Sequence, residues 1–359
     1  MGIPASMQAV RIHAHGGPEV LRVEEIPVPK PAPGQALVKV LGVSLNHLDL
    51  WVRRGMPGFA VAFPRILGCD GTGEIVALGS GVTSLEVGDK VVIEPGYTSG
   101  KSSSGQSGSD KAGSDHLAPD YSIRGEHSDG IACEYAAVDV RYLLPLPKGL
   151  EPVQAAAVPL VFITAWGLVV TRAVVQPGET VLVLGGASGV GSAAIQLARQ
   201  RGARVFATAG SPDKQRLCRE LGAEAVLDHR DPNWGKEFKK LSGGKGADVV
   251  VEHVGPATWK TSMAVLARNG RLVTCGGTTG AIVELVLPHL FIKNQSVLGS
   301  TMGPRSAYPE IFALLAKGVL RPVVDRVLPL GSVREAHELL ESRAVVGKIV
   351  LVPGPEVRP

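Results

Sequence analysis

The stretch "LVLGGASGVGSAAIQLARQRGARVFATAGS", residues 182–211, carries the strongest fold signal in the chain. An apolar run leads into a turn rich in glycine, and a helix of small residues follows it. A strand, turn and helix in this order gather backbone N–H groups and the positive end of a helix dipole around one point, which suits a phosphate. The alternative is a turn that only packs the helix tightly on its sheet. The predicted nucleotide-binding residues are Gly186, Ser188, Gly189, Val190 and Gly191.

The sequence on either side extends this pattern into a domain. From about residue 162 to 302, apolar strands such as "TVLVLG" and "ADVVVEHVG" alternate with amphipathic helices. Apolar strands that alternate with helices indicate a parallel sheet covered on both faces. Residues 7–150 are instead rich in Gly and Pro with short β-type runs, which favours a mainly β domain. The expected fold class is α/β, with a doubly wound parallel sheet and a second, mainly β domain.

Composition excludes several classes of function. The formal charge is only +4 over 359 residues, and no basic run with interleaved aromatics occurs, so no nucleic-acid partner is expected. No apolar run approaches the roughly 20 residues of a membrane span, so no membrane partner is expected. The four cysteines lack any CxxC spacing, which suits a reducing cytoplasm.

The residues that follow the strands indicate which dinucleotide binds. A carboxylate at the tip of the second strand would bond a ribose 2′-hydroxyl and repel a 2′-phosphate. Here "RVFATA" leads into Gly210 and Ser211 without an acid at the tip, which favours NADP over NAD, although Asp213 argues the other way. Arg230 is an alternative phosphate partner, and backbone support is an equal alternative for His253. The further predicted cofactor-binding residues are Ser211, Lys214, His229, His253 and Gly276.

Several motifs together resemble one family. "GGASGVGSAAIQLA", "PLVFITAWGLV", "LNHLDLWVRRG", "ILGCDGTGEIVALGSGVTSLEVGDKV" and "GKIVLV" are similar to the medium-chain dehydrogenase/reductase superfamily, with the quinone and enone reductases as its nearest branch. The resemblance implies a GroES-like catalytic domain, residues 1–161 and 303–359, around a Rossmann domain, residues 162–302, with the active site between them. It also places Thr164 against the nicotinamide. It implies a homodimer or homotetramer formed through the sheet edge, with "QSVLGST" as the candidate strand.

The metal positions of the family depart from the zinc-dependent pattern. Where zinc-dependent members carry Cys, His and Cys, this chain has Asn46, Cys69 and Leu160. A catalytic zinc needs three ligands drawn from His, thiolate and carboxylate, so no zinc is expected. An alternative is a residual metal site at Cys69 and Asp70. The four positions of the family's structural zinc carry no thiol either: Ser99, Ser102, Gly105 and Gly113.

Two further segments have less specific signals. Residues 96–130 begin with a tract of Ser, Gly, Lys and Asp, which predicts a surface loop, with a lid or a dimer contact as alternatives. Arg53 and Arg54 in "VRRG" are expected to be solvated.

These observations predict an enzyme. Reducing an isolated ketone requires strong polarisation of its oxygen, whereas hydride attack on a quinone or enone leaves charge spread over a conjugated system. We therefore expect an NADPH-dependent reductase of quinones or α,β-unsaturated carbonyl compounds, with NAD possible as cofactor. The predicted catalytic residues are Asn46, Asp49 and Thr164. The alternatives are an alcohol or aldehyde dehydrogenase of the same superfamily and a catalytically idle dinucleotide-binding protein.

Overall fold

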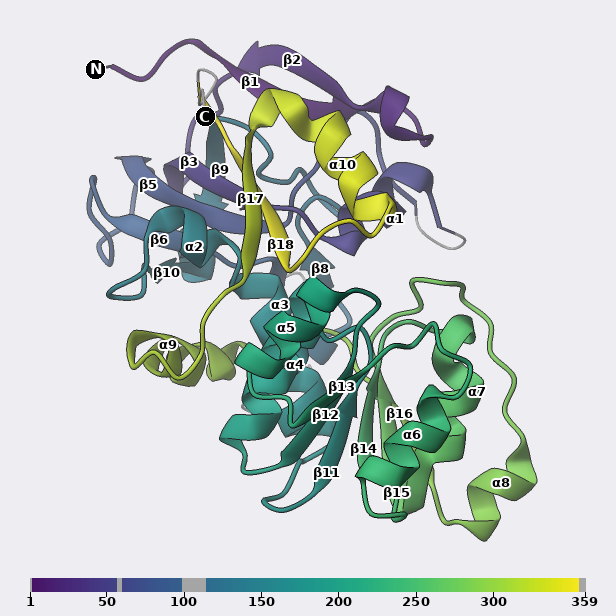
Figure 1. Cartoon of the computed structure of the whole chain (residues 1–359). Helices are drawn as coiled ribbons and strands as arrows, with labels where there is room; N and C mark the ends of the chain where they lie inside the picture. The colour runs from purple at the N-terminus through teal and green to yellow at the C-terminus, as the bar shows by residue number, and fades with distance from the viewer. Residues whose placement is uncertain (1, 57–59, 99–113, 355–359) are drawn as a thin grey trace. The chain divides into compact units, whose positions relative to one another are not determined.

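The computed structural model describes residues 2–56, 60–98 and 114–354. The chain divides into two compact units (Figure 1), the first formed by Met1–Leu160 with Pro322–Pro359 and the second by Val161–Arg321. The four positions predicted to correspond to the structural zinc ligands, together with residues 99–113 of the Ser/Gly tract, lie outside the described residues.

The second unit is built on a six-stranded, wholly parallel sheet. Its strand order is β13-β12-β11-β14-β15-β16. The order reverses between β11 and β14, because the chain winds first to one side of β11 and then to the other, and ligands bind at such a point beyond the carboxyl ends of the strands. The strands are β11 Thr180–Val183, β12 Arg204–Thr208, β13 Ala225–Leu227, β14 Ala247–Glu252, β15 Leu266–Thr274 and β16 Ser296–Gly299.

Helices connect these strands, as right-handed parallel crossovers require. All four residues of β11 are buried, as expected for a strand covered on both faces. The doubly wound α/β prediction is therefore confirmed. The helices of this unit are α3 Pro159–Trp166, which begins in the first unit, α4 Gly189–Gln200, α5 Pro212–Glu220, α6 Trp234–Leu241, α7 Pro256–Val265, α8 Leu287–Ile292 and α9 Tyr308–Ala316, with a π-helical segment at Gly167–Arg172.

The second boundary between the units differs from the predicted one. The expected break lay at residues 302/303, whereas residues 303–321, with helix α9, group with the second unit. A Cβ on Gly303 would lie 2.3 Å from the carbonyl oxygen of Ile163, so this segment packs directly on α3. The side-chain amide of Gln196 also bonds both the N–H and the C=O of Arg321, which ties the end of the segment to α4.

The first unit is mainly β. A seven-stranded sheet has the path β10-β6-β5-β3-β18-β17, with β9 paired to β3, and a three-stranded sheet has the order β2-β1-β4. The strands are β1 Ser6–Ile12, β2 Arg22–Pro27, β3 Gln35–Ser44, β4 Arg65–Ile66, β5 Asp70–Leu78, β6 Lys90–Ile93, β7 Gly96–Thr98, β8 Tyr121–Ile123, β9 Tyr135–Asp139, β10 Leu143–Pro145, β17 Val324–Pro329 and β18 Lys348–Val352. Its helices are α1 His47–Arg54, α2 Pro152–Ala156 and α10 Val333–Glu341.

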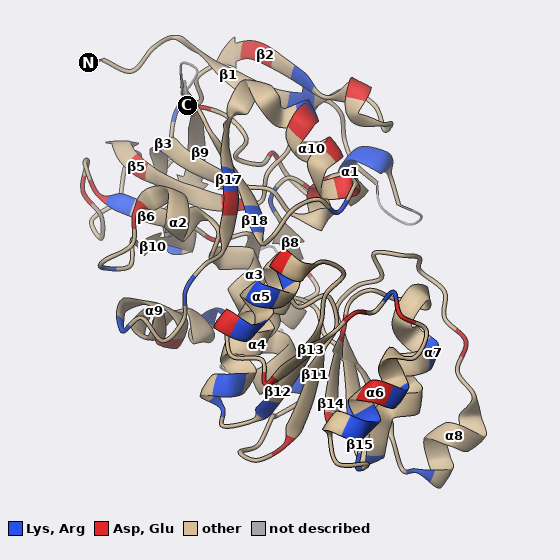
Figure 2. Cartoon of the chain, viewed as in Figure 1, with Lys and Arg blue, Asp and Glu red and all other residues tan. Residues whose placement is uncertain are grey.

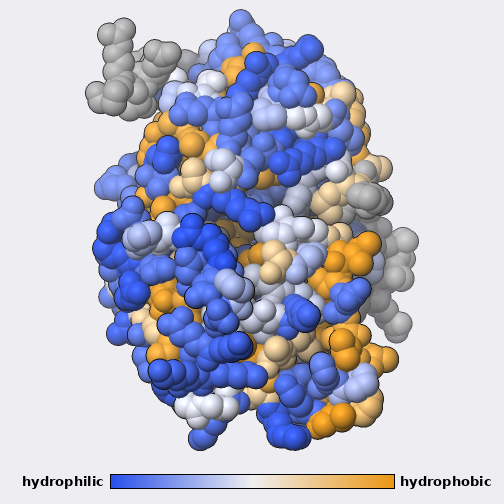
Figure 3. All heavy atoms as spheres, turned by 45° about the vertical axis from the view of Figure 1, so that its right-hand side comes forward, coloured by the Kyte–Doolittle hydropathy of each residue, from blue (hydrophilic) through white to orange (hydrophobic). Residues whose placement is uncertain are grey.

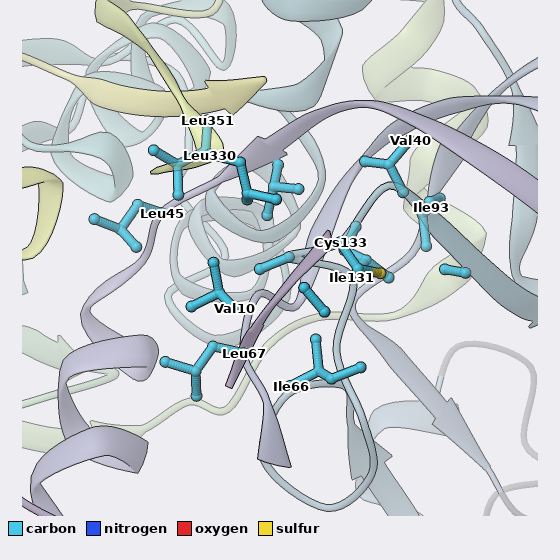
Figure 4. Packing of buried hydrophobic residues seen from close by; sticks show 14 of the residues in the cluster. Val10, Val40, Leu45, Ile66, Leu67, Ile93, Ile131, Cys133, Leu330 and Leu351 are labelled. Carbon is cyan, nitrogen blue, oxygen red and sulfur yellow. The ribbon is translucent and has the colours of Figure 1, made fainter. Parts of the chain in front are cut away.

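Apolar side chains from both ends of the chain form one core in this unit. Figure 4 shows Val10, Val40 and Ile93 from the early strands together with Leu330 and Leu351 from the last part of the chain. The register brings segments that are far apart in the sequence together. Ser44 at the end of β3 stands opposite both Asp70 of β5 and Val350 of β18. The last residue of β3, the first residue of β5 and the middle of β18 therefore lie side by side.

None of the helices in the described part of the chain is long and apolar enough to span a membrane. In the view of Figure 2, basic and acidic residues are interspersed over both units, and helices such as α5 and α6 carry both signs.

Candidate functional site

The glycine turn lies between β11 and α4, as the sequence predicts. Ser188 is the N-cap of α4, and its Oγ accepts a hydrogen bond of 3.0 Å from the N–H of Gly191. A Cβ on Gly191 would lie 2.3 Å from the carbonyl oxygen of Gly185, so only glycine fits there. Gly185 itself has a φ of 57°, in the left-handed region that favours glycine. The bare backbone and the helix N-terminus fit a dinucleotide diphosphate.

Ser188 also contacts His253, which follows β14. The distance from Ser188 Oγ to His253 Nε2 is 3.1 Å. Burial lowers the pKa of His253 to about 4, so its imidazole is neutral at pH 7. Of the two predicted cofactor-binding residues His253 and Gly276, His253 is the one that contacts the glycine turn directly. Gly276 lies beyond β15, where its N–H and C=O contact the hydroxyl of Thr274.

The candidates for the adenosine ribose gather at the ends of β12 and β13. Ser211 caps α5, and its Oγ accepts the N–H of Lys214 at 3.4 Å. A Cβ on Gly210 would lie 3.3 Å from His229 Nε2 and 3.5 Å from Arg230 Nε, so both side chains border the strand tip. His229 is oriented by a 3.3 Å contact between its Nδ1 and the hydroxyl of Thr208.

The two carboxylates near this tip are each paired with an arginine. Asp213 forms a 2.8 Å ion pair with Arg216 along α5. Asp228 binds Arg230 through two parallel hydrogen bonds, which hold the pKa of Asp228 down at about 2. Both acids thus have a basic partner of their own.

Thr164 lies in α3 and is 6% exposed. Its hydroxyl makes a long contact of 3.9 Å with the sulfur of Met302. A thioether is a weak acceptor, so this hydroxyl keeps most of its hydrogen-bonding capacity. Its predicted place beside the nicotinamide remains a prediction.

Asn46 is the centre of a buried polar cluster in the first unit. Its Nδ2 donates to Asp70 Oδ1 at 2.8 Å and to the carbonyl oxygen of Ser44 at 3.1 Å, and lies 3.3 Å from Cys69 Sγ. Its Oδ1 accepts a short hydrogen bond from Lys348 Nζ. An amide nitrogen carries two hydrogens. Since both have partners inside the protein, Asn46 organises the cluster, and its predicted catalytic role stays a prediction.

Asp49 occupies the first turn of α1 and fixes the backbone around Asn46. Its Oδ2 accepts the N–H of Asn46 at 2.7 Å, and its Oδ1 accepts the N–H of Gly68 at 3.0 Å. Burial raises the pKa of Asp49 to about 6, although both hydrogen bonds and the charge of Lys348 act in the opposite direction. The carboxylate therefore serves the loop structure, as its position after the N-cap suggests.

Lys348 is the residue of this cluster that sequence reasoning missed. It begins β18, is 4% exposed, and also donates to the carbonyl oxygen of Leu45 at 2.6 Å. Burial lowers its pKa, while Asp70, Cys69 and Asp49 raise it. Burial also raises the pKa of Asp70. The available signal was the lysine that opens "KIVLV", a charge at the edge of an otherwise apolar strand.

The three positions of the family's catalytic zinc do not present a suitable ligand set. Cys69 is fully buried, and burial together with Asp70 and Asp49 raises the pKa of its thiol well above the usual range. Leu160 contributes a backbone N–H, bonded to Asp70 Oδ2 at 2.8 Å. Within residues 2–56, 60–98 and 114–354, no group of three or more His, Cys, Asp or Glu side chains is arranged to hold a metal ion. An amide, a buried thiol and an apolar side chain do not fit zinc.

The prediction that Arg53 is solvated is wrong, because its side chain is fully buried. It donates to His337 Nδ1 at 3.1 Å, to the carbonyl oxygen of Gly16 at 3.2 Å and, through a short contact, to Glu341. Arg54 is half-exposed and pairs with the same Glu341 at 2.6 Å. Arg53 thus anchors the end of α1 to α10, and α1 carries Asp49 at its other end.

We expect His337 to make the fold acid-sensitive. Burial and the nearby Arg53 and Arg54 lower its pKa to about 3, below the ordinary value near 6.5. Between these two pKa values the unfolded chain binds a proton at His337 and the folded chain does not. The contribution of His337 to stability is therefore full above about pH 6.5 and falls as the pH drops towards 3. In His337→Asn, an amide oxygen still accepts from Arg53 but does not titrate. Thermal unfolding below about pH 6.5, down to pH 4, should show the variant losing about 1.4 kcal/mol less per pH unit than the wild type. Parallel curves would contradict this.

Comparison with known proteins follows the same division of the chain. Residues 32–148 match the family described as "Alcohol dehydrogenase GroES-like domain", and residues 189–317 match "Zinc-binding dehydrogenase". A quinone oxidoreductase from Pongo abelii is 30% identical over 96% of this chain and 98% of its own length. A crystal structure described as an NAD-dependent alcohol dehydrogenase is 44% identical, with a TM-score of 0.91 over 97% of this chain and all of that one.

A third relative is a crotonyl-CoA carboxylase/reductase whose structure contains NADP. It is 27% identical, with a TM-score of 0.87, and the match covers 98% of this chain and 95% of that one. The predicted GroES-like and Rossmann domains are therefore confirmed. The relatives together identify an oxidoreductase of nicotinamide cofactors. With its glycine turn, its two-unit fold and these relatives, the chain belongs to the medium-chain dehydrogenase/reductase superfamily.

Proposed function

We propose that this chain reduces quinones or α,β-unsaturated carbonyl compounds with NADPH and without a catalytic zinc ion. The observation that carries the proposal is the cluster around Asn46. At the family's three zinc positions stand Asn46, whose amide hydrogens are both hydrogen-bonded within the protein, the buried thiol of Cys69, and Leu160. The likeness to a quinone oxidoreductase and to a crotonyl-CoA carboxylase/reductase supports this class of acceptor.

The chemistry of such acceptors suits this set of residues. When bound, the reduced nicotinamide supplies a hydride, and a proton from water completes the two-electron reduction. Attack on a conjugated system spreads the negative charge over several atoms, so strong polarisation by a Lewis acid is not required. The glycine turn holds the diphosphate, and orientation of the two reactants supplies most of the rate. Lys348 adds a buried positive charge to the catalytic unit.

The preference for NADPH rests on the residues at the tips of β12 and β13. Ser211, Lys214, His229 and Arg230 border the place where the ribose would bind, and both nearby carboxylates are paired with arginines. Basic groups favour a 2′-phosphate. The relatives include one structure that contains NADP and one described as NAD-dependent, so a direct comparison of the two coenzymes is required.

The experiment measures kcat/KM for NADPH and NADH with a panel of quinones, enones and simple ketones. We expect quinones and enones to be reduced, ketones to be inert, and chelation to leave the activity unchanged. Lys214→Ala should lower the preference for NADPH about tenfold, the worth of one charged hydrogen bond. Lys236→Ala, on the exposed side of α6, is the matched control and should behave like the wild type. Stoichiometric zinc whose removal abolishes turnover would overturn the proposal.

We also propose that the chain forms a homodimer through the second unit. Among the described strands β16 pairs only with β15, so its outer edge offers backbone N–H and C=O groups to another strand. The neighbouring helix α8 buries none of its residues, and Phe291 is 69% exposed. Hydrophobic side chains are visible on the face drawn in Figure 3. Exposed apolar groups beside a free sheet edge are typical of an interface between two-fold related copies.

Light scattering coupled to size-exclusion chromatography tests this interface. We expect the wild type to be a dimer and Phe291→Asp to be a monomer at micromolar concentration, because a charge would be buried without a partner. Val87→Asp changes an equally exposed apolar residue of the first unit and should remain a dimer. A monomeric wild type, or a dimeric Phe291→Asp, would contradict the proposal.

A further inference from the structure

His253 lies directly against the glycine turn. Its Nε2 is 3.1 Å from Ser188 Oγ, and a Cβ on Gly185 would lie only 3.3 Å from the same nitrogen. The side chain is 9% exposed, and its Nδ1 has no hydrogen-bond partner among the described residues. The ring therefore makes one polar contact within the described chain, and that contact is with the phosphate turn.

The backbone around His253 is held firmly. Its carbonyl oxygen accepts the N–H of Thr278 at 3.3 Å. The preceding residue, Glu252, is fully buried, and its carboxylate accepts the N–H of Val254 at 2.7 Å and the hydroxyl of Ser262 at 2.7 Å. Because these contacts fix the chain on both sides of His253, the ring is presented to Ser188 by a rigid turn.

The pattern of donors and acceptors selects one tautomer of His253. A neutral imidazole carries one N–H, on either Nε2 or Nδ1. With the proton on Nδ1, a buried N–H would have no acceptor among the described residues, whereas with the proton on Nε2 only an acceptor lone pair is left over. Orphaned buried N–H groups are the rarer of the two. The Nε2–H form, donating to Ser188 Oγ, is therefore favoured.

This tautomer determines what Ser188 can do. A hydroxyl oxygen has two lone pairs and one hydrogen. The N–H of Gly191 occupies one lone pair, and His253 Nε2–H occupies the other. The hydroxyl hydrogen is then the only group that Ser188 has left, and it requires a partner that accepts. A diphosphate oxygen accepts and cannot donate.

We propose that His253 is a positioning residue of the cofactor turn: it makes Ser188 a dedicated donor to the diphosphate. This inference rests on the nucleotide-dependent function proposed above. In this role His253 acts on the turn and not on the reacting atoms. It acts through Ser188, so its removal should weaken the diphosphate contact and leave contacts to the adenosine unchanged.

Binding calorimetry of the full chain tests this with ADP-ribose, which contains the diphosphate, and with adenosine, which does not. Ser188→Ala should weaken ADP-ribose binding about tenfold, the worth of one hydrogen bond to a charged group. His253→Leu should weaken it about fivefold, because the hydroxyl loses its orientation. His253→Gln keeps an N–H donor near the position of Nε2 and should bind within about twofold of the wild type. All three variants should bind adenosine like the wild type.

The double variant Ser188→Ala/His253→Leu separates positioning from general damage. If His253 acts through Ser188, the double variant should be no weaker than Ser188→Ala alone. Additive losses, or an equal loss of adenosine binding, would overturn the inference. A wild type that binds neither ADP-ribose nor NADPH would overturn the proposed function itself. Normal wild-type binding with an unaffected His253→Leu overturns only the role of His253.

Nuclear magnetic resonance of protein with 15N-labelled histidine reads the tautomer directly. We expect His253 to show an unprotonated Nδ1 and a protonated Nε2 at neutral pH, assigned by the loss of these signals in His253→Gln. A protonated Nδ1 in the ligand-free protein would overturn the inference, because Ser188 would then have given its hydrogen to the ring.

Discussion

Lys348→Met is expected to destabilise the first unit by about 3–5 kcal/mol and to abolish activity, the cost of leaving buried charges without their counter-charge. Lys348 is the cation that faces the carboxylates of Asp70 and Asp49, and it bonds the side chain of Asn46. Methionine fills a similar volume but donates nothing, so two buried carboxylates lose their positive neighbour. Chemical denaturation followed by circular dichroism measures the loss of stability.

A matched control and a second substitution make this result specific. Lys30→Met removes an exposed lysine from the same unit and should change stability by less than about 0.5 kcal/mol. Adding Asp70→Asn to Lys348→Met should recover part of the loss, because one uncompensated carboxylate is then gone. The double variant should therefore be more stable than the sum of the two single losses predicts. A Lys348→Met protein as stable as the wild type would show that the cluster is not held by this charge.

Gly191→Ala is expected to weaken NADPH binding at least 100-fold, about 2.7 kcal/mol. The new Cβ would lie 2.3 Å from the carbonyl oxygen of Gly185 and 2.9 Å from the Cα of Gly186, both backbone atoms that cannot swing aside. The turn must therefore move, and with it the N–H groups that we propose bind the diphosphate. Fluorescence titration with NADPH measures the affinity.

The direction of the stability change makes this variant informative. Helix propensity alone would make alanine better than glycine by about 1 kcal/mol in a helix. The clash in the turn predicts the opposite, a loss of about 1–3 kcal/mol. Gly331→Ala is the control, since a Cβ there meets nothing within 4 Å and it lies in the other unit. A Gly191→Ala protein that is more stable and binds NADPH normally would show that the turn is not the cofactor site.

Elements that depend on a short contiguous segment could be predicted from the sequence. Contacts between residues far apart in the sequence could not. The glycine turn is contiguous, so the strand, the turn and the helix after it could be predicted from residues 182–211. The contact between Lys348 and Asn46 spans 302 positions, and it exists because β18 pairs with β3. No periodicity within either segment specifies that pairing.

Arg53 shows the same limit in a different way. Two consecutive arginines at the end of a helix are usually solvated. Arg53 is buried because His337 and Glu341, 284 and 288 positions later, lie on the helix packed against it. Likewise, the pattern of apolar strands and helices alone does not locate the boundary between the units after residue 303. Residues 303–321 join the second unit through contacts to Ile163 and Gln196, which no local pattern reveals.

The position of β18 within the sheet β10-β6-β5-β3-β18-β17 sets an order of events during synthesis. This last strand lies next to β3, whose residues leave the ribosome some 300 positions earlier. The interrupting unit, Val161–Arg321, is contiguous and has every strand of its sheet while the final residues are still being joined. The nascent chain can thus complete its second unit first. The edge of β3 that pairs with β18 stays unpaired until translation ends.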